Sequence, residues 1–427
     1  MMRPKRTPTL LLITALGAAG VIGAFVISGW GGRVALALAQ VYGAVSPASV
    51  SFSREDEHAA TTTENETARP QSVVEHMAAP DPVKAVYMTQ CYGGAPSLRA
   101  NIIKLVDATE LNAIVLDLKD YSGTVSFPSK IALEGKGCTI SDFRDLIKEM
   151  HDHHIYVIGR LTVFQDPLYS KAHSDEAVQS KSHNGPWKDR KGLSFIDVGS
   201  EPFHQYIISL AREAHDLGVD EINFDYVRYP SDGDMKNTEY THSGPNHPEM
   251  LEKFFKELTD GVRADQPLHT PVLSADLFGM TTTNTDDLNI GQVLERAMPY
   301  FDFIDPMVYP SHYPNGFHGY KDVNKNGYGI VLFSMSEAVR RTVATTTSVE
   351  SMTYTRIGTS TPALYEKPSY PASKMRPWLQ DFNYPVPYTP AMVAEQIKAT
   401  HDAGLQSYLF WDPANRYNSL RQILRSE

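Results

Sequence analysis

The stretch DEINFDYVRYP, residues 220–230, alternates like a β-strand and ends in polar side chains. Apolar Ile222 and Phe224 alternate with Asn223 and Asp225, and the run stops at a proline. An unpaired charge inside a protein costs several kcal/mol, so an Asp on a buried strand requires a partner or a function. The carboxyl end of a parallel strand is a place where such a side chain meets other polar groups.

A short apolar run followed by an amphipathic helix recurs eight times after residue 83. This pattern predicts a (β/α)8 barrel, the TIM barrel of the α/β class, with all strands ending at one rim. A doubly wound open sheet is the alternative, but TQCYGGAPS, residues 89–97, lacks the G-x-G-x-x-G turn typical of that fold. The predicted strands are residues 83–88, 113–119, 155–161, 219–227, 271–278, 301–309, 376–382 and 406–412.

Apolar residues at helical spacing lie between these strands, and Gly218 and Gly404 stand where two helices should end. The predicted helices are residues 98–110, 141–154, 202–218, 247–263, 290–301, 335–346 and 390–404, with a short one after Arg416.

The amino terminus, residues 1–45, has a different character. Arg3, Lys5 and Arg6 precede an uncharged apolar run from Thr9 to Trp30, roughly the 20 residues that cross a bilayer. Positive charge before the run predicts a single-pass membrane anchor with its N-terminus inside and the remainder outside the cytoplasm.

A cleaved signal peptide and secretion is the alternative, because Ala37 and Ala39 offer the small residues of a cleavage site. Both interpretations export the rest of the chain. Residues 46–82 are polar and predict a flexible linker with a root-mean-square span of about 35 Å. The barrel domain is expected over residues 83–427.

The two cysteines, Cys91 and Cys138, suit an exported protein with one disulfide. The bond is feasible if both residues follow adjacent strands at the same rim, and two unrelated thiols are the alternative.

The composition describes a globular protein and excludes some partners. Of the 427 residues, 42% are hydrophobic and 21% are charged, which allows a large core. The net charge of −11 and the lack of a basic cluster argue against nucleic acid as a partner. We expect no metal and no cofactor, because the sequence has no matching motif.

In a closed barrel the polar side chains at the strand ends surround one opening. Trp187, Trp378 and Trp411 fall on a rim loop or at strand ends, and an aromatic surface beside carboxylates suits sugar rings. A carbohydrate substrate is therefore expected. The predicted substrate-binding residues are Asp117, Lys119, Arg160, Asn223, Arg228, Tyr309, His312, Trp378 and Trp411.

Glycoside hydrolysis needs two carboxyl groups, one protonated and one ionised. Asp225, near Arg160 and Arg228, suits the nucleophile or base, and Asp276 on the next strand suits the acid. Asp381 and Asp305 are the predicted substitutes for the acid.

Each of these residues also has a purely structural interpretation. A strand-end Asp such as Asp120 or Asp412 often caps a turn. Asp117 and Lys119 could pair with each other inside the barrel, and Trp378 could simply fill its interior.

The chain resembles a bacterial family of "putative glycosyl hydrolase" domains with an expected (β/α)8 barrel. The likeness extends from about Val83 to Tyr417 and implies a glycosidase. It rests on the motifs VLDLKDYSG, INFDYVRYP, LSADLFG, IDPMVYPSHY, RPWLQDF and FWDPANRY.

The fourth strand is also similar to that of chitinase-type barrels, whose D-x-x-D-x-D-x-E run supplies the acid. Here Asp220 and Asp225 occupy two of those positions, Asn223 a third, and Val227 stands in place of the Glu. That departure argues against acetamido-assisted chemistry.

The sequence thus predicts a membrane-tethered hydrolase that cleaves an extracellular or cell-wall polysaccharide. Two alternatives are a noncatalytic carbohydrate-binding barrel and a polysaccharide deacetylase or lyase.

Overall fold

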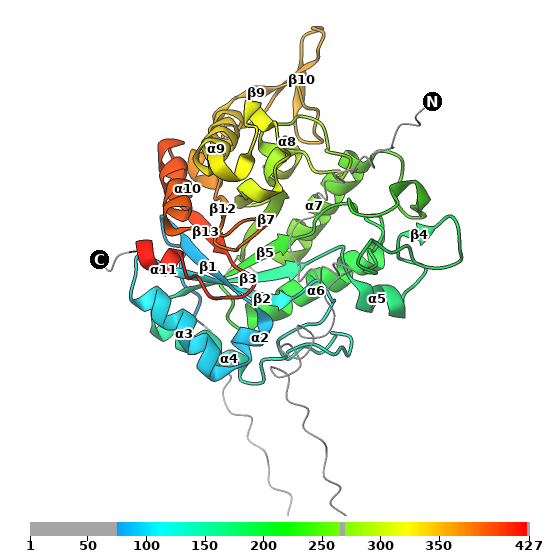
Figure 1. The fold of residues 1–427 in the computed structure, drawn as a ribbon. Coiled ribbons are helices and arrows are strands. Elements are labelled where there is room, and N and C mark those ends of the chain that lie inside the picture. The colour runs from blue at the N-terminus through cyan, green and yellow to red at the C-terminus, as the bar shows by residue number, and fades with distance from the viewer. Residues whose placement is uncertain (1–74, 265–269, 425–427) are drawn as a thin grey trace, which may run out of the picture. The chain divides into compact units, whose positions relative to one another are not determined.

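Eight parallel strands close into a barrel in the computed structural model, which describes residues 75–264 and 270–424 (Figure 1). The order around the barrel is β1, β2, β3, β5, β7, β8, β12 and β13, and β13 pairs with β1 to close it. This closure confirms the predicted (β/α)8 barrel and excludes the open sheet. The barrel strands are β1 (Lys84–Met88), β2 (Ala113–Lys119), β3 (Tyr156–Thr162), β5 (Glu221–Asp225), β7 (Val272–Phe278), β8 (Phe303–Met307), β12 (Trp378–Gln380) and β13 (Tyr408–Trp411).

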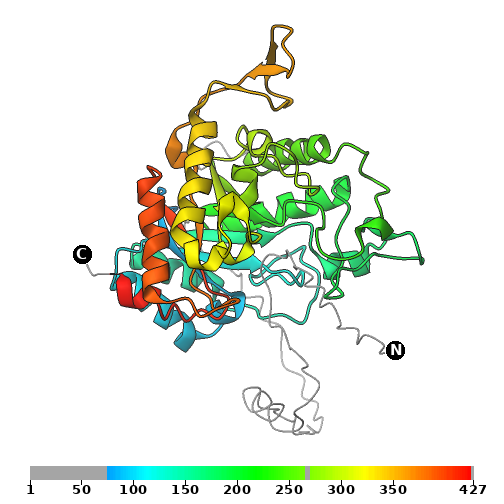
Figure 2. The ribbon, with the colours of Figure 1, turned by 45° about the horizontal axis from the view of Figure 1, so that its top comes forward.

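The helices surround the barrel, as both views show (Figure 2). Side chains that cap the first turn explain where several of them begin. The hydroxyl of Ser200 accepts a hydrogen bond from the Phe203 amide at the start of α6. The hydroxyl of Thr389 accepts one from the Met392 amide at the start of α10. The α-helices are α2 (Gln90–Gly93), α3 (Pro96–Asp107), α4 (Phe143–Asp152), α5 (Pro167–Ala172), α6 (Glu201–Asp216), α7 (His247–Arg263), α8 (Leu294–Ala297), α9 (Gly327–Val343), α10 (Pro390–Asp402) and α11 (Leu420–Ile423).

Two predicted helices differ from the structure. The helix expected over 290–301 is a single turn, α8, because Gly291 adopts a left-handed conformation before it and Pro299 follows closely. The helix expected from residue 335 begins at Gly327 instead. Glycines in its first turn weaken the helical signal there, although the apolar spacing continues.

The strands bury two separate apolar clusters, one on each side of the sheet. Ile222 and Phe224 of β5 belong to the larger cluster, which fills the space between barrel and helices. Tyr156, Met307 and Trp378 belong to the smaller cluster, which fills the barrel interior. Because successive side chains of a strand point to opposite faces, the polar residues of β5 face the barrel interior.

Two small sheets are formed by loops outside the barrel. One joins the loop after β3 to the loop after β5, and the other precedes β12. The β10–β11 hairpin of the second sheet projects from the barrel in both views (Figures 1 and 2). Their strands are β4 (Gln179–Ser180) and β6 (Thr238–Glu239) in one sheet, and β9 (Thr346–Thr347), β10 (Thr355–Ile357) and β11 (Leu364–Glu366) in the other.

The predicted anchor, residues 1–45, and most of the predicted linker lie outside the described residues. Among the helices that are described, none combines the length and apolar character needed to cross a bilayer. The last linker residues contact the barrel, since the Met77 amide donates to Asp220 Oδ1 at 2.7 Å.

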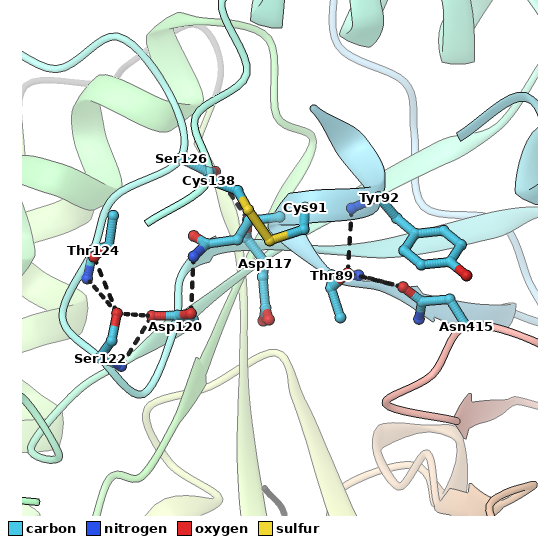
Figure 3. Close-up of a disulfide and its surroundings, with 11 residues drawn as sticks. Thr89, Cys91, Tyr92, Asp117, Asp120, Ser122, Thr124, Ser126, Cys138 and Asn415 are labelled. Atoms are coloured by element: carbon cyan, nitrogen blue, oxygen red, sulfur yellow. Dashed lines mark hydrogen bonds between the residues drawn. A yellow bond between two sulfur atoms is a disulfide. The ribbon is translucent and has the colours of Figure 1, made fainter. Parts of the chain in front are cut away.

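A disulfide joins the loops that follow β1 and β2 (Figure 3). Cys91 lies in α2 and Cys138 in the long loop before α4, with Cα atoms 5.0 Å apart. The structure thus decides between the two alternatives that the sequence left open, in favour of the disulfide. Asp120, in the same loop, accepts from the amide and hydroxyl of Ser122, so it stabilises a turn as its structural interpretation predicted.

Replacing Cys91 and Cys138 together with Ser is expected to lower the free energy of unfolding by roughly 2–4 kcal/mol, because a link across 47 residues no longer restricts the unfolded chain. Denaturant unfolding of the full-length protein measures the change. Reductant should shift the wild-type transition to the position of the double variant and leave the variant unmoved. A wild-type transition that is insensitive to reductant would contradict this expectation.

Candidate active site

Carboxyl groups from three strands meet at one guanidinium group at the carboxyl end of the barrel. Arg160 Nη1 contacts Asp117 Oδ1 at 2.5 Å, and Nη2 forms an ion pair with Asp225 Oδ2. Arg160 Nε lies 3.8 Å from Asp276 Oδ2. We call these four residues the Arg160 cluster. All four were predicted from the sequence, and the structure brings them together from β2, β3, β5 and β7.

The charge of Asp225 is thus paired, although its side chain is buried. Its second oxygen, Oδ1, accepts a hydrogen bond from the Tyr226 amide at 2.5 Å. Tyr226 has a φ of 54°, a strained value for a residue with a side chain, at the point where β5 ends. That turn directs the backbone amide toward the carboxylate.

Asp276 has the surroundings of a protonated acid. Its Oδ1 accepts from Asn223 Nδ2 at 2.9 Å and from Trp378 Nε1 at 2.7 Å. Burial raises the pKa of Asp276 well above its usual range, and the nearby negative charges of Asp225 and Asp305 raise it further. The Arg160 charge and the Asn223 bond oppose this effect without cancelling it. Asp276 therefore holds its proton more tightly than an ordinary carboxyl group.

Asp117 is the third carboxyl group of the cluster. Burial raises its pKa to about 6, whereas the Arg160 charge and a hydrogen bond from the Tyr87 hydroxyl lower it. Tyr87 also contacts Asp117 Oδ2 and places its ring 5.8 Å from the Arg160 guanidinium carbon. The alternative pairing of Asp117 with Lys119 is wrong, because Asp117 pairs with Arg160.

A second guanidinium group, Arg376, neutralises carboxyl groups deeper in the barrel. Its Nε bonds Asp305 Oδ1 at 2.8 Å, and its Nη1 bonds Glu221 Oε2 at 3.0 Å. All three side chains are fully buried. Sequence reasoning missed Arg376 and Glu221. The strand period would have found them, because Arg376 shares a face with Trp378, and Glu221 shares one with Asp225.

Asp305 forms its ion pair with Arg376 and not with Arg160. Burial raises the pKa of Asp305 to about 6, and its ion pair with Arg376 lowers it. Asn223 lies between the two groups of charges, because its Nδ2 contacts both Asp276 Oδ1 and Asp305 Oδ2. Asn223 is fully buried and holds these two carboxyl groups in place.

Two other predicted residues point away from the Arg160 cluster. An irregularity in the β2–β3 register between Asp117 and Lys119 turns the Lys119 side chain toward the helices, where Nζ pairs with Asp166 Oδ2 at 2.9 Å. Asp381 accepts from the Leu420 amide at 3.2 Å, at the start of α11, and burial raises its pKa to about 7. Both are structural partners of neighbouring elements.

Arg228 fixes the loop after β5. Its guanidinium carbon lies 4.7 Å from the ring centroids of both Tyr226 and Phe278. Its Nη1 donates to the Tyr229 carbonyl at 3.0 Å and to Ser231 Oγ at 3.2 Å. Burial lowers its pKa, and the side chain is almost fully enclosed.

The aromatic residues of the rim differ in accessibility. Trp378 is enclosed in the barrel interior, and Trp187 is buried within its loop, where Nε1 donates to the Asp234 carbonyl at 3.1 Å. Trp411 keeps part of its ring accessible and lies 5.5 Å from the Tyr309 ring, which in turn lies 5.3 Å from His312. Of the three tryptophans that were expected to form a sugar-binding surface, Trp187 and Trp378 are buried and Trp411 is partly accessible.

Solved structures with similar folds include enzymes that act on sugars. A hypothetical protein from Ruminiclostridium thermocellum is 32% identical over 45% of this chain and 96% of its own, with a TM-score of 0.39. The α-galactosidase from Thermus thermophilus is 12% identical over 80% of this chain and 59% of its own, with a TM-score of 0.45. The chitobiase from Flavobacterium johnsoniae is 11% identical over 81% of this chain and 48% of its own, with a TM-score of 0.47.

This chain therefore spans about half the length of the two named glycosidases. No curated protein matches it. The family described as "Putative glycosyl hydrolase domain" matches residues 85–417, which extend from β1 to beyond β13. Because that match includes all eight barrel strands and the whole Arg160 cluster, the chain belongs to this glycosyl hydrolase domain family.

Proposed function

We propose that the protein hydrolyses glycosidic bonds of an extracellular or cell-wall polysaccharide at the Arg160 cluster. One observation carries the proposal. Asp225 and Asp276 lie beside the same guanidinium group, but only Asp225 forms a close ion pair with it. Two neighbouring carboxyl groups in unlike surroundings are what acid-assisted cleavage requires.

Asp276 would donate the proton to the leaving oxygen. Both hydrogen-bond donors of Asp276, Asn223 Nδ2 and Trp378 Nε1, point at Oδ1. The oxygen that accepts two N–H bonds is a poor place for a proton, so the proton belongs on Oδ2, the oxygen nearer Arg160. As the glycosidic bond breaks, its electron pair leaves with the oxygen, which takes this proton.

Asp225 would act on the anomeric carbon as nucleophile or as base. As nucleophile it forms an ester that water then hydrolyses, with Asp276 taking the proton of that water; as base it removes the proton of an attacking water directly. In both cases water supplies the hydroxyl group of the new reducing end. Both carboxyl groups contact the same guanidinium group, so they are close enough together to act on one glycosidic linkage.

Export of the barrel by an N-terminal membrane anchor, or by a cleaved signal, is part of the proposal. The disulfide between Cys91 and Cys138 supports it, since such bonds persist in oxidising compartments. A polysaccharide outside the cytoplasm is the substrate that this location offers.

Asp225→Asn and Asp276→Asn in the full-length protein are each expected to lower kcat/KM by roughly 10²–10⁴-fold, because each removes one of the two carboxyl groups of the reaction. The measurement is the release of reducing ends from a panel of cell-wall polysaccharides. Asp216→Asn, at the exposed end of α6, is the matched control and should keep the wild-type rate.

Full activity of Asp225→Asn would contradict the assignment of Asp225 as nucleophile or base. Glycan binding without new reducing ends would indicate a noncatalytic binding barrel instead. Mass spectrometry that finds acetate or unsaturated sugars among the products would indicate a deacetylase or a lyase.

Trp378→Phe is expected to move the basic limb of the pH profile of kcat/KM to higher pH. The Trp378 N–H bond favours ionised Asp276, so its loss raises the pKa of the acid while Phe retains most of the packing. The other groups that act on the pKa of Asp276 are Asp225, Asp305, Arg160 and Asn223, and all of them stay in place.

Trp187→Phe is the matched control, because it also removes a buried indole donor, which bonds the Asp234 carbonyl. The basic limb of the pH profile of this variant should coincide with that of the wild type. A basic limb that stays in place in Trp378→Phe, or moves to lower pH, would refute the assigned role of Trp378.

A further inference from the structure

A series of ring contacts leads from the Arg160 cluster outward along the β8, β12 and β13 side of the barrel. Tyr309 begins the series; burial raises the pKa of its hydroxyl well above the usual range, and the nearby charges of Asp276 and Asp225 raise it further. Phe382 contacts Tyr309 at 5.6 Å and Trp411 at 4.9 Å between ring centroids. These contacts connect the loop after β8 with the ends of β12 and β13.

The series ends in solvent. His312 contacts Phe382 at 5.9 Å and Tyr384 at 6.4 Å between ring centroids. Exposure rises along this path, from 3% for Tyr309 through the half-buried rings of Phe382 and His312 to 42% for Tyr384. Tyr384 thus presents an accessible aromatic surface at the outer end of a connected row of rings.

One buried side chain holds the two loops that carry these rings. Gln380 Oε1 accepts from the amide and hydroxyl of Ser311, at 3.3 and 2.9 Å. Its Nε2 donates to the carbonyls of Phe382 and Tyr384, at 3.0 and 3.1 Å. Because both ends of the Gln380 amide are used, the rings on the two loops are held in a fixed relation before any ligand arrives.

The His312 ring carries no charge at neutral pH, because burial, together with the nearby charge of Lys191, lowers its pKa to about 4. Rings without charge attract the apolar C–H faces of pyranose sugars. We propose that Trp411, Phe382, His312 and Tyr384 form a row of sugar-binding positions that extends from the Arg160 cluster, with Tyr384 at its outer end. This inference rests on the proposed function and deepens it, because it assigns the substrate to linear glycans of several units.

The test measures how affinity depends on chain length. Calorimetry on full-length Asp276→Asn protein, which does not consume its ligand, compares the biose and hexaose of the cello-, chito-, malto- and xylo-oligosaccharide series. One series should bind as the hexaose more tightly than as the biose. In that series Tyr384→Ala should lower the ratio of hexaose to biose affinity about tenfold, because one stacking position is lost.

Two matched variants separate ring stacking from damage to the loop. Tyr384→Phe keeps the ring and should keep the ratio. Val386→Ala alters an equally exposed side chain of the same loop and should also keep it. The proposal is overturned if Tyr384→Ala leaves the ratio unchanged, if Val386→Ala lowers it as much, or if no hexaose binds more tightly than its biose.

This outcome is independent of the catalytic assignment. Binding that weakens in Tyr384→Ala, together with full hydrolysis by Asp225→Asn, would leave the row of sugar-binding positions intact and remove the assigned chemistry. Loss of hydrolysis in Asp225→Asn, together with an unchanged affinity ratio in Tyr384→Ala, would support the assigned chemistry and remove the row of sugar-binding positions.

Discussion

The guanidinium group of Arg160 makes the rest of the site possible. Three buried carboxyl groups at one end of the barrel would repel each other by several kcal/mol if all were ionised and unpaired. One largely enclosed cation, Arg160, pairs closely with Asp117 and Asp225 and leaves Asp276 at a longer distance. The cluster thereby places two neighbouring carboxyl groups, Asp225 and Asp276, in unlike surroundings, a difference that arises from geometry and not from residue type.

Arg376 likewise pairs with carboxyl groups deeper in the barrel. Its ion pair with Asp305 distinguishes that residue from Asp276, which lies beside Arg160. Asp276 and Asp305 stand opposite each other on β7 and β8, and burial raises the pKa of both. Asp305 is bonded to Arg376 through both oxygens, whereas the direct donors of Asp276 all point at one oxygen. The second oxygen of Asp276, Oδ2, lies 3.8 Å from Arg160 Nε, a longer distance than those between Asp305 and Arg376.

The fold was predictable because strands and helices each produce a characteristic spacing of apolar residues in the sequence. All eight strands lie where alternation and apolar runs predicted them, and the residues of the Arg160 cluster follow from their position at strand ends. Side-chain direction was harder to predict. A register irregularity turns Lys119 outward, and Asp381 serves α11, although both carry the same strand-end signal as Asp225. Such outcomes depend on partners far away in sequence, which local pattern does not contain.

Closure of the barrel has a consequence for its biogenesis. The seam pairs Lys84 of β1 with Tyr408 of β13, and Thr89 bonds Asn415 across a separation of 326 residues. Contacts between such distant positions form late, because the loop that joins them must be closed first. A ribosome that has just released the first strand therefore holds a chain with an open edge. The cylinder becomes complete only when the last strand has been synthesised, so the Arg160 cluster, which is built from β2, β3, β5 and β7, is enclosed only after synthesis of the chain is nearly finished.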